Sequence, residues 1–77
     1  MEITSKKNGS ILKIYINNKL HLVLNLVFIY HLRSHFIKGQ NEYFIDIYYH
    51  TGNIFTLKYD KQEKFEDVLF LIDEAIK

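Results

Sequence analysis

The sequence contains no cysteine, no proline and no tryptophan, and only three of its 77 residues are glycine. Without cysteine, the chain can form neither a disulfide framework nor a thiolate metal site. Small domains need such cross-links when their core is poor, so their absence fits a protein that relies on packing. The glycines, Gly9, Gly39 and Gly52, are each explained by a turn, and none belongs to a glycine-rich phosphate loop.

A large charge of one sign is also missing. Ten basic and nine acidic residues give a formal net charge of +1, and Arg33 is the single arginine. A dedicated nucleic-acid-binding domain usually has a clear excess of Lys and Arg. Nucleic-acid binding therefore remains the alternative function, and its candidate residues are the early lysines Lys6, Lys7, Lys13 and Lys19, together with aromatic side chains of the sheet.

No hydrophobic run is long enough to span a membrane. The longest mostly apolar segment, residues 20–32, has 13 residues and contains His21, Asn25 and His31, whereas a spanning helix needs about 20 apolar residues. Residues 1–10 lack the apolar core of a signal peptide. We expect a cytoplasmic protein without a membrane partner, and the many Ile, Asn, Tyr and Phe residues suggest an AT-rich bacterial, phage or plasmid genome.

Apolar residues are plentiful: 48% of the chain is hydrophobic and 16% aromatic. This content excludes intrinsic disorder, which requires low hydrophobicity. The length fits one domain over residues 1–77. Because residues 1–10 are mostly polar, we expect them to be loosely ordered.

The C-terminal part predicts a hairpin and a helix. Residues 42–49 and 53–59 are rich in β-branched and aromatic residues, and the loop between them offers Gly52 for a positive φ. The register that follows places Ile45 opposite Leu57 and Ile47 opposite Phe55. Asp60 and Glu63 have the spacing of a capping box. Apolar residues then recur at helical spacing, which predicts a helix from Lys61 to about Ala75: Phe65, Val68, Leu69, Ile72 and Ile76.

The first half is less distinct. Residues 11–16 predict a strand that ends at the turn pair Asn17-Asn18. Every even position from Leu20 to Leu32 is apolar, which favours one bent strand or two strands joined near Asn25, with a buried helix as the alternative. Residues 38–41 then form a turn. The predicted fold is α+β: an antiparallel meander sheet of four to five strands, with one C-terminal amphipathic helix packed on one face.

The sequence offers no catalytic arrangement, and we expect no enzyme, cofactor or metal site. His31 and His35 would share one face of a helix, where they could bind zinc. On the predicted strand they are about 13 Å apart, too far to share a metal ion. None of Ser5, Ser10 and Ser34 has the context of a hydrolase nucleophile.

The most informative residues lie on the second face of the hairpin, where Phe44, Tyr48 and Ile54 point away from the predicted helix. Such a face of a half-buried sheet should be polar. Either the sheet curls to cover these side chains, or they form an interface with a partner. Our leading hypothesis is a small non-enzymatic protein-interaction module that binds through this aromatic face or a strand edge, and the sequence leaves a homodimer open. Size and composition also suggest a phage or mobile-element inhibitor of a host factor such as a defence nuclease.

Overall fold

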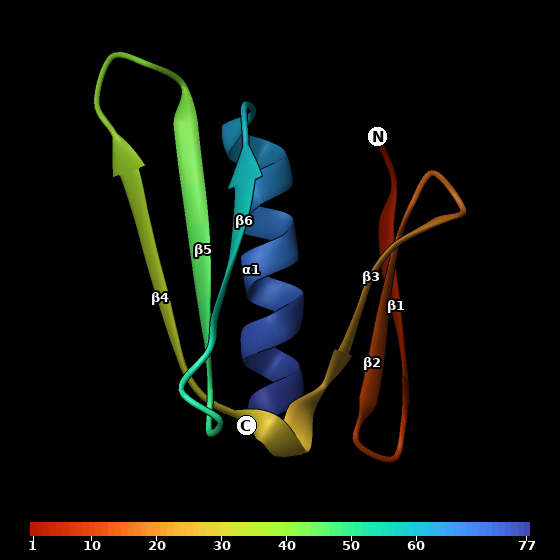
Figure 1. The fold of residues 1–77 in the computed structure, drawn as a ribbon. Helices are drawn as coiled ribbons and strands as arrows, with labels where there is room; N and C mark the ends of the chain where they lie inside the picture. The colour runs from red at the N-terminus through yellow and green to blue at the C-terminus, as the bar shows by residue number, and fades with distance from the viewer.

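The computed structural model describes residues 1–77 and shows six antiparallel strands followed by one helix (Figure 1). The strands form two three-stranded sheets, with the orders β1-β2-β3 and β4-β5-β6. The α+β class and the C-terminal helix are confirmed, but the prediction of a single sheet is wrong. The elements are β1 (Ile3–Asn8), β2 (Ile11–Ile16), β3 (Lys19–Asn25), the 3-10 helix η1 (Leu26–Phe28), β4 (Ile29–Ile37), β5 (Glu42–Tyr49), β6 (Ile54–Tyr59) and α1 (Gln62–Ile76).

The chain passes from the first sheet to the second at Asn25. The side-chain Oδ1 of Asn25 accepts a hydrogen bond from the backbone N–H of Val27 at 3.3 Å, as a favoured N-cap residue does. The resulting turn of η1 interrupts the extended backbone, although the apolar alternation continues through it. The prediction of two strands near Asn25 is thus confirmed and the buried helix is wrong, but the two strands belong to different sheets.

The N-terminal residues, which the sequence predicted to be loosely ordered, include a strand. β1 pairs with β2 along its whole length, from Ile3 opposite Ile16 to Asn8 opposite Ile11. The backbone N–H of Glu2 also donates to Asn17 Oδ1 at 3.0 Å. Main-chain hydrogen bonds to a neighbour are enough to order an edge strand, so β1 needs no apolar alternation and its sequence did not predict it.

The turns predicted at Asn17-Asn18, at residues 38–41 and at Gly52 are all present. Asn17 and Asn18 have φ values of 50° and 66°, the left-handed pair that a two-residue hairpin turn requires. Gly52 has a φ of 91° and joins β5 to β6. The hairpin register is confirmed, with Ile45 opposite Leu57 and Ile47 opposite Phe55.

The helix begins at Gln62, and the predicted capping box is wrong. Lys61 is the N-cap residue, and its side chain makes no capping hydrogen bond. β6 extends to Tyr59, so the bend from the sheet to the helix takes up both Asp60 and Lys61. Asp60 therefore lies one position before the N-cap and cannot cap the helix. At the C-terminal end of α1, Lys7 Nζ donates a hydrogen bond of 3.3 Å to the backbone carbonyl of Ala75.

One hydrophobic core lies between α1 and the two sheets. α1 packs against β1 and β2 of the first sheet and against β5 and β6 of the second, as its position between the sheets in Figure 1 suggests. The core residues come from both sheets and the helix: Leu12, Ile14, Leu22, Leu24, Ile29, Ile45, Ile47, Tyr59, Phe65, Val68 and Ile72. No helix of this protein combines the length and apolar character needed to cross a membrane.

Candidate functional site

β4 is the outer strand of the second sheet, and it pairs only with β5. With nine residues it is the longest strand, and it contains neither Pro nor Lys. Natural proteins usually protect an edge strand with a short length, charged side chains (lysine above all), a proline or a bulge, and among these charged residues β4 carries only Arg33. The one irregularity in the pairing of β4 lies at its start, between Ile29 and His31. Most of β4 therefore presents an open row of backbone N–H and C=O groups.

The other outer strands are better protected. β1 carries Lys6 and Lys7 and is contacted by α1. β3 and β6 are the outer strands on the sides where the two sheets face each other (Figure 1). They are linked by a hydrogen bond of 2.9 Å between His21 Nε2 and Tyr59 Oη. Burial raises the pKa of Tyr59 to about 12, and burial together with the charge of Lys64 lowers the pKa of His21.

α1 leaves the helix-side face of β4 partly uncovered. On this face Leu32, Ser34 and Phe36 lie opposite Ile47, Ile45 and Tyr43 of β5, respectively. Three adjoining hollows follow the face along α1: between Phe36 and Phe65, between Ser34 and Leu69, and between Leu32 and Ile76. The first two share Glu66, and the last two share Leu32 and Asp73. They form one continuous depression, the β4–α1 groove.

Two aromatic side chains stand at the rim of the β4–α1 groove. Phe36 on β4 is 63% exposed and Phe70 on α1 is 62% exposed. The ring centroid of Phe36 lies 6.3 Å from that of Tyr43, which is its only aromatic neighbour. Large apolar side chains that are exposed together beside a groove are typical of interaction surfaces.

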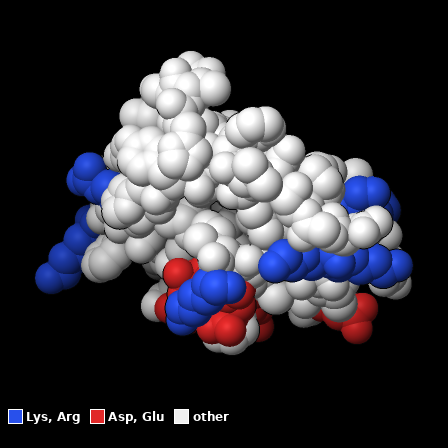
Figure 2. Space-filling view, turned by 90° about the horizontal axis from the view of Figure 1, so that it is seen from below, with Lys and Arg blue, Asp and Glu red and all other residues white.

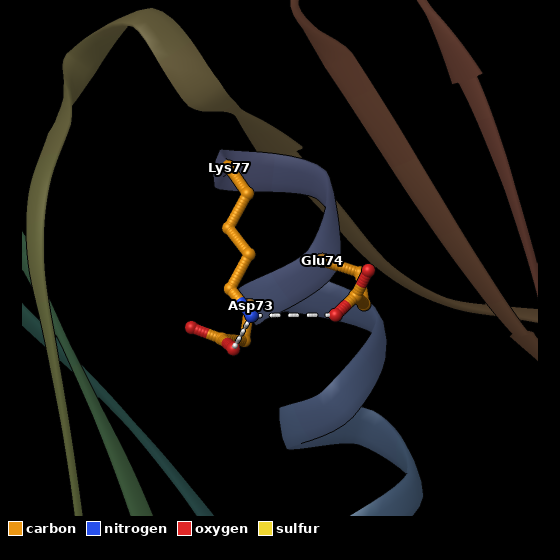
Figure 3. A network of polar contacts seen from close by, with 3 residues as sticks. All are labelled: Asp73, Glu74 and Lys77. Carbon is orange, nitrogen blue, oxygen red and sulfur yellow. Dashed lines mark hydrogen bonds and ion pairs between the residues drawn. The ribbon is translucent and has the colours of Figure 1, made fainter.

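Acidic side chains line the helix wall of the groove. Asp73 is paired with Lys77 Nζ at 3.4 Å, and Glu74 is paired with the same nitrogen at 3.4 Å (Figure 3). Hydrogen bonds to Asp73 and Glu74 raise the pKa of Lys77. Glu66 instead accepts a hydrogen bond of 2.7 Å from the neutral amide of Gln62 and has no cationic partner.

The outer face of the second sheet holds the residues that the sequence proposed for partner binding. Tyr48 and Ile54 are cross-strand neighbours. Phe44 lies farther along β5, beyond Asp46, and stacks on His35 with ring centroids 4.8 Å apart. Asp46 accepts a hydrogen bond of 2.8 Å from Thr56, and its other oxygen lies 3.5 Å from His35 Nδ1. The structure thus brings Tyr48 and Ile54 together, while polar side chains separate them from Phe44.

Sequence reasoning missed an aromatic cluster around Tyr48. The ring centroid of Tyr48 lies 6.2 Å from that of Tyr30 and 5.3 Å from that of His31, and Tyr30 also lies 5.3 Å from His50. Figure 2 views the molecule from the end where the β5–β6 turn lies. Uncharged atoms cover most of that view, with Lys and Arg at both sides and a mixed group of basic and acidic side chains at the lower edge. The irregularity after Ile29 brings Tyr30 to this cluster, so simple alternation did not predict it.

The four early lysines do not form one patch. Lys6 and Lys13 are cross-strand partners beside a hollow that Tyr15 also lines, and Lys6 Nζ lies 5.9 Å from the Tyr15 ring. Lys7 is on the opposite face, where it bonds to the end of α1. Lys19 lies opposite Ile16, beside the β2–β3 turn. Only two of the proposed nucleic-acid-binding residues are therefore adjacent.

The two histidines weighed as a metal pair lie on β4. His31 and His35 point to the outer face, with Arg33 between them in register. No group of three or more His, Asp or Glu side chains is arranged to hold a metal ion. No protein-family model, curated protein or solved structure matches this chain.

Proposed function

We propose that this chain is a small non-enzymatic module that binds a partner protein through the second sheet, with the free edge of β4 at the centre of the interface. The observation that carries the proposal is the nine-residue open edge of β4, flanked on both faces by exposed aromatic side chains. Phe36 stands on the groove side, and Tyr30, 58% exposed, stands with Tyr48 on the other.

The physical basis is strand addition. An extended segment of a partner would pair its backbone with the open N–H and C=O groups of β4, and its alternate side chains would reach the two flanking faces. Tyr and Phe suit such a surface, since they provide a large contact area at low cost in side-chain entropy. Tyr48 and Ile54 would then contact the partner from the outer face, as proposed from the sequence.

Capture of the partner from cells of the source organism tests this proposal, with two matched variants. Phe36→Asp places a charge beside the β4 edge, and Val23→Asp places one on the exposed side of β3. Circular dichroism should show both variants folded. We expect one or more proteins to be lost from the Phe36→Asp sample and retained with Val23→Asp. Equal capture by both variants and the wild type would contradict the proposal.

A second candidate function, nucleic-acid binding, is favoured by one observation. Lys6 and Lys13 lie side by side next to Tyr15 on the outer face of the first sheet, and no acidic residue lines the hollow between them. Titration with labelled single-stranded oligonucleotides at two salt concentrations tests it, because phosphate contacts weaken steeply with salt. Binding that falls in the double variant Lys6→Gln, Lys13→Gln would support this function, and no binding at low salt would exclude it.

Size and composition, rather than geometry, motivate our further proposal that the partner is a host factor blocked by a phage or mobile-element protein. Mass spectrometry of the captured protein tests it. We expect a host enzyme, such as a defence nuclease, whose activity falls when the purified chain is added. A captured protein whose activity does not change on addition would contradict the inhibitor hypothesis.

A further inference from the structure

Two charged side chains of opposite sign flank the β4 edge without an ion pair. Glu66 on the groove side has only the neutral Gln62 as a partner. On the outer side, Arg33 lies opposite Asp46 in register, but Asp46 is engaged by His35 and Thr56, and Arg33 has no ion pair. A strand bound beside β4 would therefore meet a carboxylate without an ion pair on the groove face and a guanidinium without an ion pair on the outer face.

These charges lie at neighbouring positions along β4. Ser34, the residue after Arg33, lines the same hollow as Glu66. A strand that pairs with β4 places consecutive side chains on opposite faces. One residue of such a strand would meet Glu66 in the groove, and the next would meet Arg33 on the outer side.

Apolar side chains line the hollows at the two ends of the groove. Phe36 and Phe65 line one of them beside Glu66, and Leu32 and Ile76 line the other beside Asp73, which is paired with Lys77. Along β4, Phe36 and Leu32 are two residues from Ser34 in either direction, which is the spacing of side chains on one face of a strand.

From this arrangement we infer that the β4–α1 groove takes an extended segment of another protein with the pattern apolar–any–basic–acidic–apolar. The two apolar residues and the basic residue face the groove, where the basic residue pairs with Glu66. The acidic residue faces outward and pairs with Arg33. The inference rests on the proposed function, since it specifies the partner that strand addition to β4 selects.

A second copy of this chain that pairs antiparallel does not fit the same site. Two β4 strands paired antiparallel about a two-fold axis perpendicular to the sheet keep the same face on the same side. In the register centred on Arg33, the Arg33 of one copy would lie opposite the Arg33 of the other on the outer face, and like charges opposite one another destabilise a strand pair. The groove face of β4 carries Leu32, Ser34 and Phe36 and offers no basic group for Glu66.

A pair of fluorescent peptides of equal composition tests the inference. The probe is acetyl-Thr-Leu-Thr-Lys-Glu-Leu-Thr-amide, and the control exchanges its Lys and Glu. In both peptides the two Leu residues stay in place, so that the same alternate side chains face the groove. We expect the probe to bind about tenfold more tightly than the control at low salt, because two attractive pairs become repulsive. This preference should shrink as added salt screens the charges.

A charge exchange in the protein provides the reciprocal test. The double variant Glu66→Lys, Arg33→Glu should reverse the preference, so that the control peptide binds more tightly than the probe. Both side chains are exposed, so the variant should fold like the wild type. Two methylated forms of the probe test the backbone pairing, one with its odd-numbered amides N-methylated and the other with its even-numbered amides N-methylated. Only one of these two sets of amides pairs with β4, so one form should lose binding and the other should keep it.

Equal affinity for the two peptides, or an unchanged preference in the double variant, would overturn the inference. If neither peptide binds but partner capture is still lost in Phe36→Asp, the inference falls and the proposed function stands. If capture does not depend on Phe36 either, both fall. A dimer in light scattering that Phe36→Asp separates into monomers would assign the groove to a second copy and overturn the inference.

Discussion

The two sheets have the same number of strands and the same meander order, yet the outer strands that α1 leaves uncovered differ. In each sheet α1 packs on the central strand and on one outer strand, β2 and β1 in the first sheet and β5 and β6 in the second. The remaining outer strand of the first sheet, β3, is linked to β6 by the hydrogen bond between His21 and Tyr59, whereas β4 of the second sheet lies beside an open groove. In our proposal the central strands provide stability and β4 provides binding.

The largest effect is expected where the two sheets are alike. Ile14 on β2 and Ile47 on β5 are both fully buried, at 0% exposure. Ile14→Ala and Ile47→Ala should each lower the free energy of unfolding by about 3 kcal/mol, since each leaves a cavity in the shared core. Urea unfolding followed by circular dichroism measures this. A loss below about 1 kcal/mol in one sheet alone would show that the sheets do not share one core.

The contact between the sheets should fail at high pH. The pKa of Tyr59 is raised by burial to about 12, from 10.0 in the unfolded chain. Between these values the unfolded state releases a proton that the folded state keeps, so stability should fall as the pH rises from about 10 to about 12. Thermal melts should show this decline in the wild type and in the exposed control Tyr30→Phe. If the same decline persisted in Tyr59→Phe, titration of Tyr59 would not be its cause.

A smaller decline in stability is expected at acidic pH, and it comes from His21, the partner of Tyr59 in the hydrogen bond between the sheets. Burial, aided by Lys64, lowers the pKa of His21 below 6.5. As the pH falls below about 6.5, the unfolded state takes up a proton that the folded state resists, so stability is lost until the folded pKa is passed. His21→Gln should flatten the melting temperature over this range, and the exposed control His50→Gln should not. Parallel curves for both variants would contradict this role of His21.

The smallest effect is expected at the rim of the groove. Phe36→Ser and Phe70→Ser remove large but exposed rings, and each should change the free energy of unfolding by no more than about 0.5 kcal/mol. Phe65→Ser removes a ring that is only 8% exposed and should cost at least about 3 kcal/mol. Chemical denaturation of the three variants compares them directly. A large loss in Phe36→Ser would mean that this ring stabilises the fold instead of serving a partner.

Local patterns predicted much of the fold. The register of β5 and β6 follows from a three-residue loop and strict alternation, and the Asn17-Asn18 pair is typical of a turn that needs two positive φ values. β1 was not predicted, because an edge strand held by main-chain bonds shows no apolar alternation. The division into two sheets was not predicted either, since the alternation runs on through Asn25 and only its side-chain cap ends β3.

The candidate site could be predicted only in part. The pairing of Tyr48 with Ile54 follows from the hairpin register. The groove depends on where α1 crosses the second sheet, and no local pattern specifies that. One signal was present in the sequence: Phe70 lies outside the apolar stripe of the helix formed by Phe65, Val68 and Ile72, and the structure leaves it exposed at the groove rim.

Amide hydrogen exchange, measured by NMR on the free protein and on the protein saturated with the probe peptide, tests the central claim most directly. If β4 is the binding edge, amides of residues 29–37 gain protection in the complex, while those of β1, β2 and β3 exchange as before. Protection gained in the first sheet, or binding without any gained protection in β4, would contradict the account.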